Sequence, residues 1–366
     1  MRKWFRQNNK NSYSIAALMP LLRADLAPGP RAGIMLYSFA TPQAGEVYHE
    51  VNQAREAGLD ALFIAGGPHP SALPEEALEY FDYVVIGEGE ETLPELIDAI
   101  ETGRGAASVR GIAYRRGEEA IYTGDRPPVD LDCYPPFSSI LAPIEITRGC
   151  PWGCAYCQTP RLFGRCMRHR SIPVISRFAR RHKDIRFTSP NSLAYGSDGR
   201  RPRLEKVSAL LEALRGQKKP IYFGTFPSEV RPDFVSDEAL EIITRHCANR
   251  SISLGGQSGS PAVLERIERG HGRQEIESAC EIILEHGLIP QVDLIFGLPM
   301  ESAEDQKMSL DLVRWIEGKG GKVRAHRFMP LPGTPLWEET PSPLSRDAEA
   351  LLGSLAQKGR LSGSWG

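Results

Sequence analysis

The chain has 366 residues, with 44 Lys and Arg against 46 Asp and Glu, giving a formal charge of −2. This length predicts about two domains. The near-neutral charge argues against a dedicated nucleic-acid binder, which would carry a broad basic field. No apolar run approaches the ~18 residues that a membrane helix needs, and a polar stretch follows the basic start, where a signal peptide would be apolar. We therefore expect a cytoplasmic protein.

The first third of the chain alternates short apolar runs with helical patterns. The patterns predict strands at 31–38, 60–65 and 83–86, helices at 45–58, 74–80 and 90–101, and a hairpin at 111–123. Such alternation predicts a parallel sheet covered on both faces, the doubly wound (Rossmann-like) α/β fold. Gly66, Gly67 and Gly87 follow the second and third strands, where such sheets bind ligands. We assign residues 1–124 to this domain.

A proline-rich segment separates the two halves of the chain. Residues 125–136 contain four prolines, and proline propagates neither a helix nor a central strand. We interpret residues 125–142 as an interdomain linker.

From residue 143 the alternation of strands and helices resumes. The patterns predict strands at 144–147, 184–188, 221–225, 251–254, 291–296 and 322–328, and helices at 172–181, 203–216, 237–247, 261–268, 273–287 and 302–318. Six strand–helix units predict a partial (β/α)6 barrel over residues 143–337. The remainder, residues 338–366, is polar and rich in small residues, and we expect it to form a peripheral tail.

Three of the seven cysteines crowd into one short segment. Cys150, Cys154 and Cys157 form a C-x3-C-x2-C motif after the first strand of the second half. Three thiolates at this spacing can bind one cluster or metal ion, whereas disulfides would leave one thiol over. A zinc site normally takes four ligands, and no second Cys or His pair follows at the usual distance. A [4Fe-4S] cluster accepts three cysteines and leaves one iron open. Coincidental thiols and a zinc ion with a distant ligand are the alternatives.

The other four cysteines are scattered through the chain. We expect Cys166, Cys247 and Cys280 to be buried small apolar residues, with radical relays or second-cluster ligands as the alternative. Cys133 has no assigned role.

The cysteine motif resembles the signature of the radical S-adenosylmethionine (SAM) superfamily, in which an aromatic or apolar residue, here Tyr156, precedes the last cysteine. The resemblance implies that the three cysteines bind a [4Fe-4S] cluster and that SAM chelates its open iron. Reduction of the cluster would then cleave the sulfonium and release a 5′-deoxyadenosyl radical. An external electron donor of the flavodoxin or ferredoxin type is expected.

Segments behind the motif, over roughly residues 143–337, resemble the same superfamily. They imply that SAM is bound at the ends of successive strands, by Tyr156, by Ser189 and Asn191, by Ser228, Glu229 and Arg231, by Gly256 and Gln257, and by Gly297. Glu229, Arg231 and Gln257 may equally be ordinary polar residues of strand ends. No catalytic residue is assigned.

The glycine turns at 66–71 and 84–92 resemble the cobalamin-binding domain fused to many radical SAM enzymes. The resemblance covers roughly residues 10–105 and implies that cobalamin lies over the strand ends, near Gly66, Gly67 and Gly87. Many such domains carry D-x-H-x-x-G after the first strand, but the corresponding loop, residues 37–43, contains neither aspartate nor histidine. Either cobalamin binds without a histidine from below, or the domain has kept the shape and lost the cofactor. For His49 and His69 we expect partly exposed packing or capping roles.

These resemblances favour a cobalamin-dependent radical methyltransferase, in which cobalt carries a methyl group from one SAM and a second SAM supplies the radical that activates a carbon. The first alternative is a radical SAM enzyme without cobalamin that catalyses a rearrangement, cyclisation or thiolation. A methylthiotransferase of the usual kind would need three more cysteines before Cys150, where only Cys133 stands. A non-enzymatic iron–sulfur redox or sensor protein is disfavoured by the SAM-like segments. The basic stretch 165–183 is expected to be a solvated helix face rather than a nucleic-acid site, and the substrate is not predicted.

Overall fold

The structure is a computed structural model that describes residues 1–8, 10–137 and 139–365. The chain divides into two compact units. Unit 1 contains Met1–Ala142 together with the short segments Arg161–Gly164 and Leu331–Gly333, and unit 2 contains the rest. Asn9, Ser138 and Gly366, which fall in the domain, linker and tail assigned from the sequence, lie outside the described residues.

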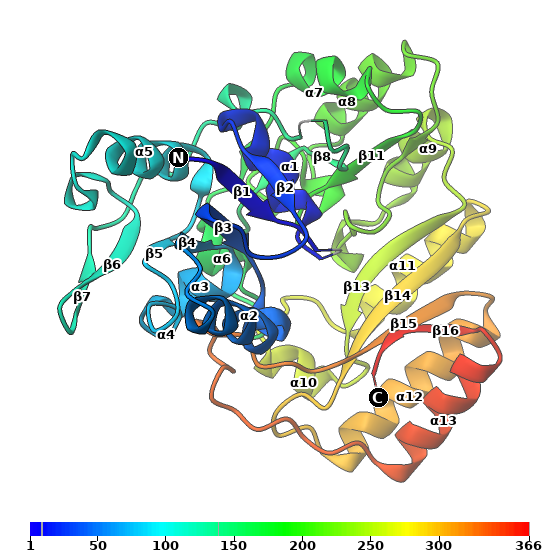
Figure 1. Ribbon diagram of the computed structural model, residues 1–366. Coiled ribbons are helices and arrows are strands. Elements are labelled where there is room, and N and C mark those ends of the chain that lie inside the picture. The colour runs from blue at the N-terminus through cyan, green and yellow to red at the C-terminus, as the bar shows by residue number, and fades with distance from the viewer. Residues whose placement is uncertain (9, 138, 366) are drawn as a thin grey trace. The chain divides into compact units, whose positions relative to one another are not determined.

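Unit 1 is built on a seven-stranded sheet in the order β2-β1-β3-β4-β5-β6-β7 (Figure 1). The strands from β2 to β5 are parallel, and the β6–β7 hairpin is antiparallel at the end of the sheet. The elements are β1 (Lys3–Arg6), α1 (Ser12–Leu18), β2 (Asp25–Ala27), β3 (Gly33–Ser38), α2 (Ala44–Glu56), β4 (Ala61–Gly66), α3 (Pro68–Ala72), α4 (Pro74–Ala77), β5 (Tyr83–Val85), α5 (Gly89–Thr102), β6 (Ile112–Arg116) and β7 (Glu119–Tyr122). This arrangement confirms the predicted doubly wound fold.

Two apolar clusters cover the two faces of this sheet. Phe63 packs with α2 and α4 in one cluster, whereas its neighbour Ile64 packs with α1 and α5 in the other. Successive side chains of a strand point to opposite faces, so a strand buried on both sides must be apolar throughout. This requirement explains why β3 and β4 were visible in the sequence as continuous apolar runs.

The N-terminal strands β1 and β2 were not predicted. β1 lies inside the sheet, between β2 and β3. It is only four residues long, and its first and last residues are basic. Both form ion pairs, since Lys3 Nζ lies 2.7 Å from Glu101 Oε1 and Arg6 Nη2 lies 2.6 Å from Glu50 Oε2. A run this short and this charged carries no recognisable strand pattern.

The proline-rich segment 125–142 packs against α5. The Val129 amide donates to Glu88 Oε2 at 2.9 Å, and the Tyr134 hydroxyl donates to Glu91 Oε1 at 2.9 Å. The regular structure in the described part of this segment is a single 3-10 turn, Leu131–Cys133. The segment therefore belongs to unit 1 in its contacts, although its composition resembles that of a linker.

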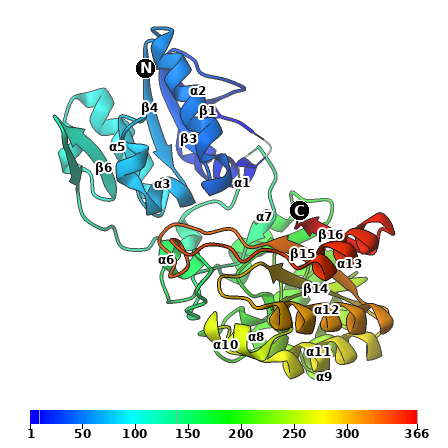
Figure 2. The same cartoon turned by 90° about the horizontal axis from the view of Figure 1, so that it is seen from below.

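Unit 2 is a partial barrel of parallel strands. β8, β11 and β12 form one sheet and β13 to β16 another, and a bridge between Val230 and Leu254 continues the order from β12 to β13. Helices α11 and α12 lie along the outer side of β14 and β15 (Figure 2). The elements are β8 (Ile144–Glu145), β9 (Thr147–Arg148), α6 (Thr159–Phe163, at the junction of the units), β10 (Arg168–His169), α7 (Ile172–Ala179), β11 (Ile185–Thr188), α8 (Leu204–Arg215), β12 (Ile221–Tyr222), α9 (Asp237–His246), β13 (Ser251–Gln257), α10 (Pro261–Arg266), α11 (Arg273–Glu285), β14 (Ile289–Phe296), α12 (Ala303–Gly318), β15 (Lys322–Arg327), α13 (Arg346–Gln357) and β16 (Leu361–Ser364).

Serine caps begin four of these helices. The hydroxyls of Ser236, Ser260, Ser302 and Ser345 accept amide hydrogens in the first turns of α9, α10, α12 and α13. Such caps satisfy otherwise unpaired amides and are worth about 1 kcal/mol each. The six predicted strands and six predicted helices of the barrel are all present. None of the helices in the described residues is long and apolar enough to cross a membrane.

The C-terminal segment adds a helix and a strand to the barrel sheet. We predicted a peripheral tail at residues 338–366, but Ala348, Leu352 and Leu355 of α13 are buried, and α13 contacts α12. β16 pairs in parallel with β15, so that Gly363 lies opposite Ala325. The sequence did not predict these two elements because only one face of α13 and one residue of β16 are buried, and the remaining positions are mostly polar or small.

A side chain at position 363 should detach this last strand. Gly363 has a φ of +110°, and an added Cβ would collide with the Ala325 carbonyl. We expect Gly363→Val to lower the free energy of unfolding by about 1–3 kcal/mol, measured by urea denaturation. Gly318→Ala is the control, since its Cβ would meet nothing within 4 Å. It should be neutral or stabilising, and an equal loss in both variants would contradict the role of β16.

Candidate functional site

The three clustered cysteines lie on the loop that follows β8 and β9, at the carboxyl edge of the barrel strands. All three are free thiols, with Cys154 buried and Cys150 and Cys157 half-buried. The loop is held in place by the Ala155 amide, which donates to the Ile267 carbonyl at 3.0 Å, and by a 3.0 Å bond from the Cys157 amide to the Cys154 carbonyl. Burial raises the pKa of Cys150 and of Cys157, and the neighbouring thiols raise both further.

This loop offers the donor set of an iron–sulfur cluster. Each cysteine of such a cluster binds a different iron, and the loop carries three free thiols. The donor set of three free thiols on one loop therefore fits a [4Fe-4S] cluster.

A buried arginine supplies positive charge beside these thiols. Arg269 donates from Nη1 to Cys154 Sγ at 3.7 Å, from Nη2 to the Gly255 carbonyl at 2.7 Å, and from Nε to His271 Nε2 at 3.0 Å. Because His271 Nε2 accepts this bond, its ring proton resides on Nδ1. Burial, together with the charges of Arg269 and Arg231, lowers the pKa of His271 to about 3, so the ring is neutral. The neutral ring thus orients the guanidinium towards the thiol.

Two carboxylates share a second arginine deeper in the barrel. Arg324 donates to Glu229 Oε1 at 2.6 Å and to both oxygens of Asp293, reaching Oδ1 at 2.8 Å. Burial raises the pKa of Glu229 to about 8, and the adjacent Asp293 carboxylate adds to the shift despite the opposing charge of Arg324. One guanidinium cannot neutralise two carboxylates, so this group of three retains a proton at neutral pH.

The shared proton should make stability depend on Glu229. A carboxyl group whose pKa is raised in the folded state stabilises the folded protein fully at pH values below its unfolded pKa of about 4.5. This contribution to the free energy of unfolding is lost as the pH rises through the folded pKa of about 8. Glu229→Gln mimics the protonated form, so its free energy of unfolding should fall less than that of the wild type from about pH 5 to about pH 9. Urea titrations at both pH values measure the difference. Glu265→Gln, at an exposed carboxyl group, should keep the wild-type slope, and an identical slope for Glu229→Gln would refute the shared proton.

Two buried donors near the cysteine loop lack partners. The Asn191 amide Nδ2 and the Arg231 Nη1 are buried and make no hydrogen bond to any residue that the structure describes. The two residues are adjacent, since the Arg231 backbone amide donates to Asn191 Oδ1 at 3.4 Å. The remaining guanidinium nitrogens of Arg231 bind Asp233 at 3.0 and 3.1 Å. Buried donors without a partner are costly, and an anionic group such as a carboxylate would satisfy both.

The other predicted residues fall into two groups. Ser189 and Ser228 meet through their hydroxyls at 2.6 Å, and Tyr156 is close enough for the charges of Arg269 and Cys154 to act on its phenol. Burial raises the pKa of Tyr156, so the phenol is neutral. These residues lie with the cysteine loop, Glu229, Asn191 and Arg231 at the carboxyl edge of the barrel.

The glycines at the fourth and fifth strand ends shape the backbone. An added Cβ at Gly256 would lie 2.7 Å from Val292 Cγ1, and its neighbour Gln257 has a φ of +74°. Gly297 lies apart, in a turn where its amide donates to Glu301 Oε2 at 2.6 Å. Burial raises the pKa of Glu301 to about 7. An added Cβ at Gly297 would lie 2.6 Å from Arg327 Nη1 and 2.8 Å from the Ser342 carbonyl oxygen, so this turn is packed against Arg327 and Ser342.

Several residues of the site were not predicted as site residues. Sequence reasoning missed Trp152, Arg269, His271, Asp293 and Arg324. The alternation of Asp293 in β14 and Arg324 in β15 with apolar neighbours was available as a signal, since it places both on the inner face of the strands. Arg269 and His271 stand in a loop with no periodic pattern.

The scattered cysteines are dispersed in the structure as well. Cys280 is buried in α11, as expected, and Cys247 is half-buried. Cys166 is exposed, so the expectation that it is a buried apolar residue is wrong; it stands in the loop between α6 and β10 rather than in a helix or strand. Cys133 is also exposed.

The glycines singled out in unit 1 lie at the carboxyl ends of two neighbouring strands. Gly66 ends β4, Gly67 follows it with a φ of +96°, and Gly87 follows β5 with a φ of +74°. A Cβ at Gly67 would lie 2.8 Å from Ser38 Oγ, whereas one at Gly87 would meet nothing within 4 Å. Glycine at position 67 therefore lets the chain pass close to the end of β3, which a side chain would prevent.

His69 in the same region is buried rather than partly exposed. Only 3% of its surface is accessible, and its Nδ1 lies 3.2 Å from Thr41 Oγ1. Its Nε2 lies 3.1 Å from the Tyr48 hydroxyl and 3.2 Å from Glu76 Oε1. Both ring nitrogens are therefore engaged inside the domain. His49 is exposed on α2.

Two known families match this chain, one in each half of the sequence. The radical SAM superfamily matches residues 144–313, and the B12 binding domain matches residues 26–97. An uncharacterized methyltransferase of Pyrococcus horikoshii is 25% identical over 80% of this chain and 66% of its own length. The bacteriochlorophyllide d C-12(1)-methyltransferase of Chlorobaculum tepidum is 24% identical over 82% of this chain and 64% of its own length. The chain thus spans just under two thirds of these relatives.

Two solved structures have the same fold. The radical SAM methyltransferase TsrM of Kitasatospora setae, with cobalamin and a [4Fe-4S] cluster bound, matches 92% of this chain and 73% of its own length at a TM-score of 0.72 and 16% identity. The cobalamin-dependent radical enzyme OxsB matches 85% of this chain and 51% of its own at a TM-score of 0.65 and 18% identity. The chain therefore carries a radical SAM domain at residues 144–313 and a B12-binding domain at residues 26–97.

Proposed function

We propose that the protein cleaves SAM reductively at a [4Fe-4S] cluster and uses cobalamin to methylate an unactivated carbon. The observation that carries the proposal is the pair of unsatisfied buried donors, Asn191 Nδ2 and Arg231 Nη1, beside a loop of three free cysteines. An amino-acid carboxylate such as that of SAM supplies the missing acceptors. When bound, the cluster would supply the electron that cleaves the sulfonium, and cobalamin would carry the methyl group.

Different residues of unit 2 would bind the cluster and SAM. Cys150, Cys154 and Cys157 would hold the cluster, and Arg269 offsets the negative charge that their thiolates bring into a buried loop. Asn191 and Arg231 would bind the carboxylate of SAM. The carboxyl group of Glu229, with Arg324 behind it, would form hydrogen bonds with ligand hydroxyls. Burial of these groups keeps water from the reacting atoms.

Unit 1 would hold cobalamin at the carboxyl edge of its sheet. The turn at Gly87 has open space where a side chain would stand, and the match to the B12 binding domain covers this edge. His69 already uses both of its ring nitrogens. The loop at residues 37–43 contains no histidine. We therefore propose that the domain binds cobalamin without a histidine ligand to cobalt.

The test of the proposed function begins with anaerobic purification and reconstitution with iron, sulfide and hydroxocobalamin. Absorption spectra of the protein after gel filtration should show a bound corrinoid. Chromatography should show 5′-deoxyadenosine formed from SAM with dithionite. Absence of bound corrinoid would refute the cobalamin part and favour a radical reaction without it. Absence of SAM cleavage by the loaded protein would refute the whole proposal.

The coordination of cobalt gives a prediction that does not depend on activity. The electron paramagnetic resonance spectrum of the bound cob(II)alamin should be the same in the wild type and in His69→Gln, and neither should show nitrogen splitting from a histidine. His49→Gln, at the exposed histidine of α2, is the control. A nitrogen splitting that disappears only in His69→Gln would contradict the proposal and make His69 the ligand.

A further inference from the structure

Trp152 stands inside the cysteine motif, between Cys150 and Cys154, and its ring contacts a buried arginine. The guanidinium carbon of Arg231 lies over the indole, 3.7 Å from the ring centroid. Arg231 is only 4% exposed, so this contact is largely shielded from water. A cation over the face of a tryptophan is attracted by the electrons of the ring, and the attraction is strongest where water is excluded. The contact joins the cysteine loop to a residue of the proposed carboxylate site.

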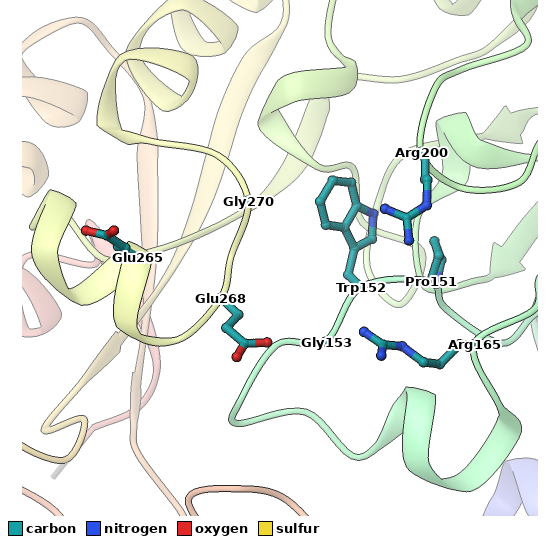
Figure 3. A pocket seen from close by; sticks show the side chains of 8 residues that line it. All are labelled: Pro151, Trp152, Gly153, Arg165, Arg200, Glu265, Glu268 and Gly270. Atoms are coloured by element: carbon teal, nitrogen blue, oxygen red, sulfur yellow. The ribbon is translucent and has the colours of Figure 1, made fainter.

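The indole is itself held in place by its neighbours. Its Nε1 donates to the Gly199 carbonyl at 2.9 Å. Gly270 has a φ of +75°, and an added Cβ there would lie 2.5 Å from the ring, so only glycine lets the chain pass this close. Figure 3 shows the ring between the Gly270 segment and Arg200, whose guanidinium lies 5.9 Å from the ring centroid. A ring fixed in this way can serve as a flat support for another side chain.

The remaining contacts of Arg231 fix its guanidinium within its own plane. Nε donates to Asp233 Oδ1 at 3.0 Å and Nη2 donates to Asp233 Oδ2 at 3.1 Å. These two bonds hold one edge of the planar group, while Trp152 covers one face. Nη1 is buried and makes no hydrogen bond to any residue in the described part of the chain. The side chain is thus held by its edge and its face, with Nη1 left for a ligand.

An aromatic ring suits this position better than a second carboxylate. Burial and the positive charge of Arg269 lower the pKa of Arg231, and Asp233 opposes the shift. A further carboxylate would stabilise the guanidinium as well, but it would accept the N–H groups of Nη1 and so compete with an anionic ligand. The face of Trp152 attracts the cation without accepting any of its N–H groups in the guanidinium plane. The ring therefore stabilises the charge and leaves the donor available.

We propose that Trp152 is a positioning residue for the carboxylate of SAM. It holds the guanidinium of Arg231 in the orientation in which Nη1 binds the ligand carboxylate together with Asn191 Nδ2. The inference rests on the proposed function, in which Arg231 and Asn191 bind this carboxylate. Because Trp152 belongs to the loop of the cluster cysteines, the carboxylate site then depends on the position of that loop.

The test compares two ligands that differ only in the carboxylate. Anaerobic calorimetry measures the Kd of the reconstituted protein for S-adenosylhomocysteine, which has no sulfonium to cleave, and for its decarboxylated analogue. In Trp152→Leu the Kd for S-adenosylhomocysteine should rise about tenfold, whereas that for the decarboxylated analogue should stay within about twofold of wild type. In SAM cleavage with dithionite, KM should rise by a similar factor with little change in kcat, as expected when a uniform binding interaction is lost.

A second comparison shows whether Trp152 acts through Arg231. Arg231→Gln alone should raise the Kd for S-adenosylhomocysteine about tenfold or more, because it removes a charged donor. Trp152→Leu/Arg231→Gln should bind within about twofold of Arg231→Gln, since residues in contact do not act independently. Losses that multiply in the double variant would show that the ring acts elsewhere and would overturn the inference.

Two further variants serve as controls. Trp315→Leu makes the same exchange at a half-buried tryptophan of α12, whose ring centroid lies 5.5 Å from Lys319 Nζ, and both Kd values should stay within about twofold of wild type. Trp152→Phe keeps a ring face but loses the bond to Gly199, so its Kd for S-adenosylhomocysteine should rise only about threefold. If Trp152→Leu does not take up its cluster, Trp152→Phe is read with the same two ligands.

The outcomes separate this inference from the proposed function. Equal weakening of both ligands in Trp152→Leu would overturn the inference, because the ring would then support the adenosine part or the loop itself. Unchanged binding of S-adenosylhomocysteine would overturn it as well. Failure of the proposed function appears in the wild type alone, as absence of SAM cleavage with dithionite or as equal affinity for the two ligands.

Discussion

A Cys154→Ala variant should lose reductive cleavage of SAM by at least about a hundredfold, because even residues behind the ligands of a metal site typically cost 10–100-fold. Cys154 is the most buried of the three clustered cysteines, and its sulfur accepts a hydrogen bond from Arg269. Two remaining thiols cannot hold a cluster that still needs an open iron for SAM. Iron content, visible absorption and 5′-deoxyadenosine formation together measure the effect.

Cys166→Ala is the matched control for this substitution. Cys166 follows the same loop but is exposed, with no partner other than a contact of 4.0 Å to the Met167 carbonyl. It should keep its iron and its SAM cleavage within about twofold of wild type, as surface substitutions generally have small effects. SAM cleavage by Cys154→Ala at the wild-type rate would contradict the assignment of the cysteine motif.

The barrel was predictable because its signals are local. Each of the six predicted strands of unit 2 contains buried apolar residues, and the serines that cap α9, α10 and α12 stand where the helical patterns begin. Parallel strands place their carboxyl ends on one edge. Residues after successive strands, such as Ser189 and Ser228, therefore meet although 39 positions separate them.

Elements that depend on tertiary contacts were not predictable. β1 lies inside the sheet of unit 1, but its four residues include two charges that are neutralised by distant carboxylates. β16 has a single buried residue, Leu361, and is held by pairing with β15. In both cases the backbone hydrogen bonds of the sheet, rather than an apolar pattern, determine the conformation.

The charge partners of the site were equally hidden. Glu229 was predicted as a ligand-binding residue, but its pairing with Arg324 joins residues 95 positions apart, the first in the loop after β12 and the second on β15. Arg269 was part of a segment of recognised resemblance, yet a buried arginine cannot be distinguished from an exposed one by its letter alone. The sequence does not show which of these charged residues are buried. Burial strengthens the electrostatic interactions between them, because the protein interior has a lower dielectric constant than water.

Arg269→Met should destabilise both the fold and the bound cluster. The guanidinium makes three hydrogen bonds at once, to Cys154, His271 and Gly255. Methionine fills a similar volume but leaves the Gly255 carbonyl without this donor, at a cost of about 1–3 kcal/mol. The loss of a positive charge also raises the pKa of Cys157, which Arg269 now lowers. Since ligands must be deprotonated to bind metal, we expect iron to be lost to a chelator about tenfold faster.

Comparison with a second buried arginine separates these two effects. Arg170 is 1% exposed, donates from Nε to the Glu145 carbonyl at 3.0 Å and lies 3.9 Å from the Glu145 carboxylate. Arg170→Met should lower the free energy of unfolding by a similar amount but leave the rate of iron loss unchanged. Arg269→Lys should restore little of the lost stability or of the slow iron release, because an ammonium group cannot reach three acceptors in one plane. If both Met variants lose iron at the same rate, Arg269 acts only through stability, and its charge has no part in holding the cluster.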